Sequence, residues 1–229
     1  PDRETLRTRL TAEAEAAKRR EIQPRSRLAT VLDLLLGDLA SALNRLTRAR
    51  SLGWSRSEHP GPIVFPFALL AAAEPGAPPE SSVLAELWDE MDCGFDLDDI
   101  PDDERTGIDE SESVAPRLSS LVSNEPKTLG ELLSTALGDL HLPAGTRRRV
   151  VERTRRVVEK RVAAIVSGKH RGAYARAARL AAAWGEGASL AGSPELGPVF
   201  LRTLCERYPR HSAFKREIND VSPRRISRR

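Results

Sequence analysis

The chain has 229 residues, which is enough to bury a sizeable core as one large domain or two small ones. Hydrophobic residues make up 40% of it and aromatic residues only 4%, so the core must be mainly aliphatic. The formal net charge of +3 is too small to indicate a partner by itself. Alanine and leucine favour helices, whereas residues typical of sheets are sparse. The sequence predicts an all-α fold, a helical bundle followed by antiparallel helical hairpins.

The cysteines and the first residues of the chain indicate the cellular compartment in which the protein is expected. Cys93 and Cys205 lie far apart without a CxxC companion, which excludes a structural zinc finger and favours a reducing cytoplasm. The first twenty residues are charged throughout and lack the apolar segment of a secretory signal. The longest apolar run, 63–73, is too short to span a bilayer. We expect a cytoplasmic protein without a membrane segment. Its first residue, Pro1, suits a piece of a longer chain.

The predicted N-terminal helical region covers residues 1–91. A polar helix over 2–21 comes first and is ended by Pro24. Leucine, valine and alanine then recur every three or four residues over 26–50. This spacing predicts one long amphipathic helix, which Gly53 ends.

Two shorter helices complete this region. Prolines limit the turns around a short buried helix at about 66–74. Ser81 or Ser82 is placed to cap the following helix over 83–92.

An acidic segment over 92–127 follows, rich in serine and proline and almost free of periodic apolar residues. Within 89–112, twelve aspartates and glutamates stand against Arg105 alone. Such a segment cannot bury enough apolar surface to offset its ordering entropy, so we expect a mobile loop or linker that divides the protein into halves. A calcium loop is not indicated, because Ile100 and Pro101 occupy positions that need an oxygen ligand and glycine.

The C-terminal half contains a predicted helical hairpin region over 128–221 and a basic tail over 222–229. Thr146 is placed to cap a long helix. The helices expected in this half span 128–140, 147–166, 171–190, 198–208 and 212–220.

The long helix is strongly basic over 147–161. Its cationic residues are Arg147, Arg148, Arg149, Arg153, Arg155, Arg156, Lys160 and Arg161. Three interpretations stay open: a solvated face whose arginine stems cover apolar surface, a docking site for the acidic segment, or a nucleic-acid or other polyanion surface aided by arginines 224, 225, 228 and 229. The lack of accompanying aromatic residues counts against the reading of single strands.

Residues 169–218 contain a helix with a face of small residues, which allows close helix packing. The pattern is carried by Arg171, Tyr174, Ala177, Ala178, Leu180, Arg207, Arg210, Phe214 and Glu217. It resembles the C-terminal helical region of bacterial SWIM zinc-finger proteins. The resemblance implies a tetratricopeptide-like interaction region in a bacterial protein. The CxC and CxH ligands of the zinc finger are absent, so zinc binding is not implied.

No catalytic, cofactor-binding or metal-ligating constellation is visible in the sequence. The four histidines lack a second ligand at metal spacing, and neither cysteine has an activating neighbour. Trp88 and Trp184 are expected in the core, and Trp54, after Gly53, at an exposed turn.

The expected function is therefore a non-enzymatic helical scaffold or adaptor that binds a partner protein. Its candidate contact residues are Trp54, Tyr174 and Trp184. The alternative is polyanion binding through residues 147–161 and the C-terminal arginines. An enzyme is the third possibility, since catalytic groups can converge from separate helices without leaving a linear motif.

Overall fold

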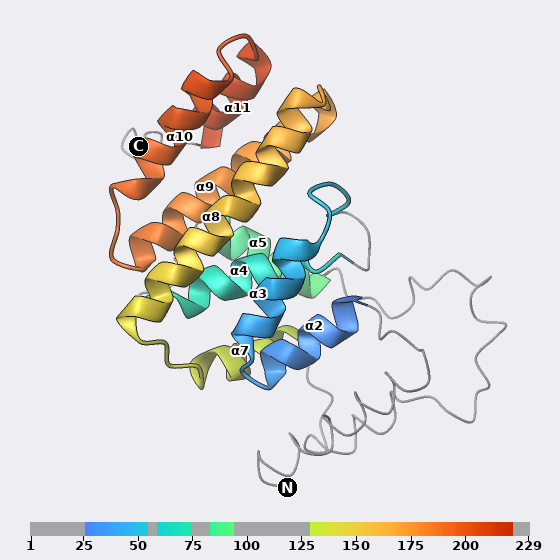
Figure 1. The fold of residues 1–229 in the computed structure, drawn as a ribbon, viewed down its shortest axis with the longest axis vertical. Coiled ribbons are helices and arrows are strands. Elements are labelled where there is room, and N and C mark those ends of the chain that lie inside the picture. The colour runs from blue at the N-terminus through green and yellow to red at the C-terminus, as the bar shows by residue number, and fades with distance from the viewer. Residues whose placement is uncertain (1–25, 55–58, 75–82, 94–128, 222–229) are drawn as a thin grey trace, which may run out of the picture.

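A computed structural model gives the structure of the protein and describes residues 26–54, 59–74, 83–93 and 129–221 (Figure 1). These residues form helices and no strand, which confirms the all-α class. The α-helices are α2 Ser26–Leu35, α3 Leu39–Arg48, α4 Gly61–Ala71, α5 Val83–Cys93, α7 Leu129–Gly138, α8 Ala144–Ser167, α9 Tyr174–Leu190, α10 Leu196–Arg207 and α11 Ser212–Val221, and a 3-10 turn, Arg171–Ala173, precedes α9. No helix in these ranges is long and apolar enough to cross a membrane. The predicted helix over 2–21, both capping serines, the acidic segment from residue 94 and the basic tail lie outside the described residues.

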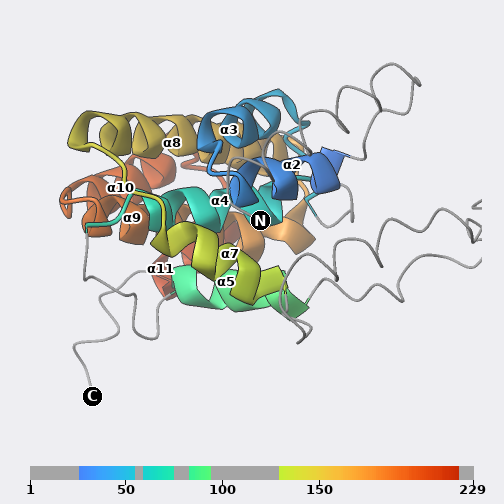
Figure 2. The ribbon, with the colours of Figure 1, turned by 90° about the horizontal axis from the view of Figure 1, so that it is seen from below.

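Helix α4 occupies the centre of the fold. Figure 2 shows it between α3 and α8 on one side and α5 and α7 on the other. Nine of its eleven residues are buried, among them Phe65 and Phe67. A helix that is apolar all round must be enclosed in this way. The prediction of a buried helix here is confirmed, but the predicted start is wrong. The helix begins at Gly61 and includes Pro66, because burial on all sides offsets the main-chain hydrogen bond that an internal proline loses.

Helix α9 is the second central element and packs against α8, α10, α11, α5 and α4. Its small residues allow close approach. A Cβ placed on Gly185 would lie 2.9 Å from the Cα of Gly197 in α10, and one placed on Gly187 would lie 2.8 Å from Leu69 of α4. The predicted small-residue face is therefore a packing surface on which two neighbouring helices rest.

The prediction of one long amphipathic helix over 26–50 is wrong, because these residues form two helices, α2 and α3. Gly37 takes a positive φ of 75°, which glycine adopts without steric cost. Asp38 then caps α3 by accepting a hydrogen bond from the main-chain N–H of Ser41, at 3.0 Å. The leucine spacing continues across the break, because both helices bury their leucines in the same core.

Two predicted helix starts need correction. The long basic helix begins at Ala144 after Pro143, so Thr146 lies inside the first turn and is not its cap. For α5, the carboxylate of Glu186 in α9 accepts hydrogen bonds from the main-chain N–H groups of Val83 and Leu84, at 3.2 and 2.8 Å. These two N–H groups belong to the helix start and have no partner within the helix, so a distant glutamate provides the cap.

The helices on both sides of the acidic segment share one hydrophobic core. α4 packs on α8 and α9 as well as on α3, and α2 packs on α7. Arg179 of α9 also pairs with Glu86 and Glu90 of α5, at 3.1 and 2.7 Å. The N-terminal and C-terminal regions distinguished by sequence are therefore packed together as one body.

Candidate polyanion-binding face

Helix α8 is the main basic element of the described chain. Its 24 residues correspond to a length of about 36 Å. Eight of them are basic and two, Glu152 and Glu159, are acidic. The apolar side of the helix is buried as expected, and its buried hydrophobic residues are Val150, Val151, Val157, Val158, Val162, Ile165 and Val166. Whether a charged residue reaches solvent depends on its angular position around the helix axis relative to this buried side.

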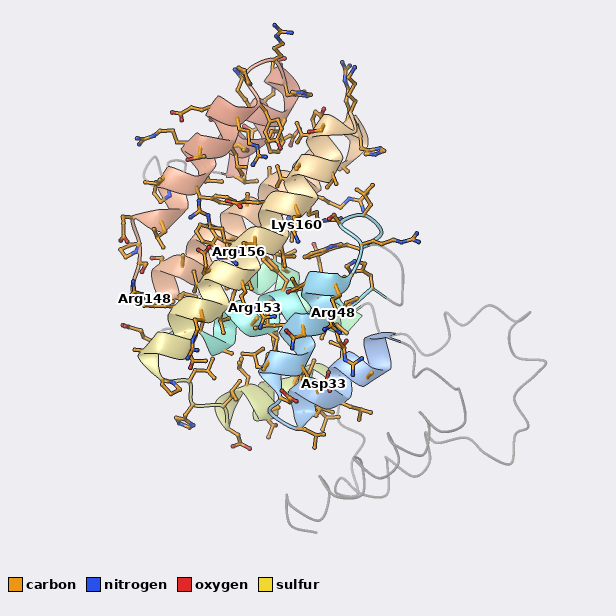
Figure 3. The ribbon with its side chains drawn as sticks, in the orientation of Figure 1. Asp33, Arg48, Arg148, Arg153, Arg156 and Lys160 are labelled. Atoms are coloured by element: carbon orange, nitrogen blue, oxygen red, sulfur yellow. The ribbon has the colours of Figure 1, made fainter. Side chains whose placement is uncertain are left out.

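Four cationic residues of α8 lie on its solvent-facing flank, and one of them, Arg153, contacts α3. Arg149, Arg153, Arg156 and Lys160 follow one another at steps of four, three and four residues, which places them on one face of a helix. Figure 3 shows the last three along α8, with Arg48 of α3 beside them. We call these five residues the basic stripe. Arg153 is half-buried and the other four are exposed.

Contacts between α3 and α8 set the register of the stripe. Arg153 Nη2 donates to Asn44 Oδ1 at 2.7 Å, and eight residues further on Arg161 Nη1 donates to the carbonyl oxygen of Ser51 at 2.8 Å. The contacted positions advance in the same direction on both elements. Arg48, between Asn44 and Ser51, therefore lies beside the turns of α8 that carry Arg156 and Lys160 (Figure 3).

Carboxylates border the stripe without filling it. Glu152 pairs with Arg156 at 3.2 Å, and the side chains are 50% and 68% exposed, respectively. Glu159 pairs with Arg155, which is not in the stripe, at 3.0 Å. On the far side of α3, Asp33 pairs with Arg45 at 2.6 Å. Exposed pairs of this kind contribute about 0–1 kcal/mol, so a denser anion can displace Glu152 at low cost.

The remaining predicted cationic residues do not join the stripe, and for Arg161 the polyanion assignment is wrong. Arg161 is only 5% exposed. Its guanidinium lies 4.7 Å from the centroid of the Trp54 ring, and its Nε has no hydrogen-bond partner. Burial, with a smaller contribution from Arg176, lowers the pKa of Arg161 to about 10. Its charge is thus used inside the protein and is not available to a partner.

Three further residues of the basic helix flank the stripe in different ways. Arg155 lies 5.8 Å from the Trp184 ring and 5.6 Å from the Phe200 ring, turned toward α9 and α10. Arg148 is exposed, and Arg147 is half-buried in the first turn. Arg148 lies one residue from Arg149 but about 100° away around the helix, because successive residues of a helix point in different directions.

The three aromatic residues predicted to contact a partner are buried, so the exposed turn expected at Trp54 is wrong and the core position expected for Trp184 is confirmed. Trp54, Tyr174 and Trp184 are 8%, 3% and 1% exposed. Arg161, His59 and Phe65 cover the ring of Trp54. Tyr174 bonds through its hydroxyl to Nδ1 of His211 at 3.1 Å, and Trp184 donates to the carbonyl oxygen of Val151 at 3.0 Å. Tyr174 thus joins α9 to the residue that precedes α11, and Trp184 joins α9 to α8.

The titratable groups outside α8 form no reactive cluster in the described ranges. His59 lies between the carbonyl oxygen of Arg50, 2.8 Å from its Nε2, and the N–H of Gly61, 2.9 Å from its Nδ1. Burial lowers the pKa of this imidazole. Burial also raises the pKa of the Cys205 thiol, which makes it a poor nucleophile. Among the described residues, no three histidine, cysteine or carboxylate side chains gather as metal ligands.

Sequence reasoning missed Arg48. Its signal is present, because Arg45 and Arg48 lie in the last turn of α3, but the sequence does not show that this turn packs beside α8.

Comparison with known proteins adds no relative, since no family model, curated protein or solved structure matches the chain. The resemblance of residues 169–218 to SWIM zinc-finger proteins, and the tetratricopeptide-like hairpin it implies, therefore stay predictions.

Proposed function

We propose that the protein binds a polyanionic partner through the basic stripe on α8 and α3. The observation that carries the proposal is the uninterrupted row of cations at 149, 153, 156 and 160, extended sideways by Arg48. Of these side chains, only Arg156 is paired with a carboxylate in the ion pairs between described residues, and that pair is exposed.

The stripe is suited to a charged partner and not to an apolar one. Large exposed hydrophobic residues among those described are Leu52 and Val199 alone, on a loop and on α10. A polyanion needs no apolar anchor, because each phosphate neutralised by a lysine or arginine releases condensed counterions and gains free energy from their dilution. This mechanism requires accessible cations at close spacing, which the stripe provides.

Binding of a partner protein by an adaptor, the other predicted function, stays a prediction. Its candidate contact residues are buried, and Leu52 and Val199 are the large hydrophobic residues that the described part of the chain exposes. The proposal of polyanion binding has the stronger structural support for this reason.

The proposal is tested with two double variants that remove the same charge. Arg156→Gln with Lys160→Gln removes two stripe cations, whereas Arg202→Gln with Arg216→Gln removes two exposed cations from α10 and α11. Binding to fluorescein-labelled polyphosphate is followed by anisotropy at low salt. We expect the stripe variant to bind about tenfold more weakly than the control variant. Each lost phosphate contact lowers the affinity at every position along the polyphosphate chain. Equal affinities, or no binding by the wild-type chain, would overturn the proposal.

A further inference from the structure

We infer that the partner is a double-stranded nucleic acid, held by its phosphate backbone along the basic stripe without reading of the bases. The inference rests on the proposed function and names the chemistry of the partner.

The dimensions of the stripe match a duplex. From residue 149 to residue 160 the helix rises about 16 Å, at 1.5 Å per residue. A duplex carries one negative charge per about 1.7 Å of its axis, so roughly nine phosphates fall within the length of the stripe. Arg48 widens the cationic surface beyond a single line of side chains. A partner with a high and fixed charge density can therefore satisfy all five cations at once.

Single strands fit this surface poorly, because they are held largely by stacking of their bases on aromatic side chains. The described aromatic rings are enclosed in the core, apart from Trp88, which is half-buried and stacks on Phe67 of α4. Neither ring lies in the stripe or on α8. A single strand would thus gain only the electrostatic part of its usual binding energy.

An acidic peptide fits less well still. A flexible chain loses conformational entropy when it is ordered on a surface, and exposed ion pairs with its carboxylates contribute little in return. Peptide partners of helical proteins usually repay this cost with apolar anchors, for which the stripe has no receiving surface. The phosphates of a duplex are already ordered, so the same five cations bind them at lower cost. The same costs apply to a peptide of the acidic residues 94–112 of this chain, which is therefore an informative comparison probe.

The width of the surface prevents α8 from reading bases in the major groove. This groove is about 12 Å wide, which is close to the diameter of one helix with its side chains. α3 packs beside α8 on one flank, and α9 packs on it as well. Two packed helices lie about 8–10 Å apart and together exceed the width of the groove. The stripe must therefore rest on the backbones, which makes binding independent of sequence.

The stripe is also held in place before binding. Arg153 is fixed by Asn44 and by Thr47, at 2.7 and 3.5 Å, and Arg149 Nε donates to the carbonyl oxygen of Gly145 at 3.2 Å. None of these partners is a carboxylate, so the full charge of both guanidinium groups remains. Their orientation reduces the entropy lost when phosphates bind.

The experiment measures anisotropy with labelled duplex DNA and duplex RNA of about two helical turns, each in two unrelated sequences, over a series of salt concentrations. A single strand of the same length, polyphosphate and a peptide of residues 94–112 are the comparison probes. We expect both sequences of each duplex to bind equally, and more tightly than the single strand and the peptide. The logarithm of the association constant should fall with the logarithm of salt concentration with a slope of about −4 to −5, from five phosphate contacts.

The outcomes separate the inference from the proposed function. If polyphosphate or the single strand binds through the stripe more tightly than either duplex, the duplex inference fails and the proposed function stands. Tightest binding of the acidic peptide overturns the duplex in favour of this chain's own acidic segment as the occupant of the stripe. A strong dependence on duplex sequence contradicts contact with the backbone alone. If no probe binds even at low salt, both the inference and the proposed function fail.

Discussion

The solvent-facing flank of helix α8 and its packed sides carry the same kind of residue in different environments. On the solvent-facing flank, Arg156 and Lys160 are exposed. On the packed sides of the helix, Arg161 is enclosed against Trp54, next to α3, and Arg155 lies over Trp184 and Phe200, next to α9 and α10. The comparison shows that a run of arginines in a sequence is not yet a charged surface. The helix phase assigns some to partners and others to packing, where an arginine stem and its planar head cover apolar rings.

The largest effect is expected from the enclosed arginine. Arg161→Ala removes the contact with Trp54 and leaves the carbonyl oxygen of Ser51 without its donor. We expect the free energy of unfolding to fall by about 2–3 kcal/mol, as for other losses of a buried, hydrogen-bonded side chain. Urea denaturation measures this change.

Two further variants sharpen that result. Arg161→Met restores apolar volume without a buried charge and should recover at least half of the loss. Arg156→Ala on the exposed flank should change the stability by no more than about 0.5 kcal/mol. Similar losses for Arg156→Ala and Arg161→Ala would remove the difference between the flanks.

A smaller loss is expected at the residue over the C-terminal rings. Arg155→Ala removes the contacts of its guanidinium with the Trp184 and Phe200 rings and the pair with Glu159. Because this side chain is only partly buried, we expect a loss of about 1 kcal/mol in thermal or urea denaturation. Its affinity for a duplex should equal that of the wild-type chain, and a tenfold loss of affinity would place Arg155 in the binding surface.

A still smaller change is expected from a single stripe cation. Arg153→Gln keeps a hydrogen-bonding group near Asn44 and removes one phosphate contact. The salt slope for duplex binding should become less steep by about 1, with the stability nearly unchanged. An unaltered slope together with wild-type affinity would exclude Arg153 from the stripe.

The smallest effect is a pH dependence near Trp54. Burial lowers the pKa of His59, so the unfolded chain binds the proton more readily than the folded one. The stability is therefore fully present above the unfolded pKa of about 6.5 and declines as pH falls from there through the lower folded pKa. Urea denaturation between neutral and mildly acidic pH measures this decline, and His59→Gln should reduce it. An identical decline in His59→Gln would assign it to other groups.

Much of the fold follows from local sequence patterns. Leucine and alanine spacing predicts the helices that the structure describes, and the small-residue face of α9 is recognisable from Ala177 to Ala188. The break at Gly37 is missed because the apolar spacing continues through it, and the inclusion of Pro66 in α4 depends on burial by six other helices. The cap that Glu186 provides for α5 joins residues about a hundred positions apart, so no local pattern contains it.

The sequence predicts that the candidate site is basic and lies on α8, but not which residues form it. The sequence locates the basic helix, and its heptad-like steps at 149, 153, 156 and 160 could have singled out the outer flank. Arg161 is excluded from the binding surface, and Arg48 belongs to it, because α3 and its following loop pack beside α8. Trp54 was placed wrongly for the same reason, because the arginine that covers it comes from that helix.

The central claim is that helix phase, and not charge alone, defines the binding surface. The most direct test compares two double variants of α8 that lose the same charge: an outer pair, Arg153→Gln with Lys160→Gln on the solvent-facing flank, and an inner pair, Arg155→Met with Arg161→Met on the packed sides. Duplex binding is titrated by anisotropy over a salt series, after each variant is shown to be folded. The account predicts a slope that is less steep by about 2 for the outer pair and unchanged for the inner pair. Equal changes in the two variants would contradict it.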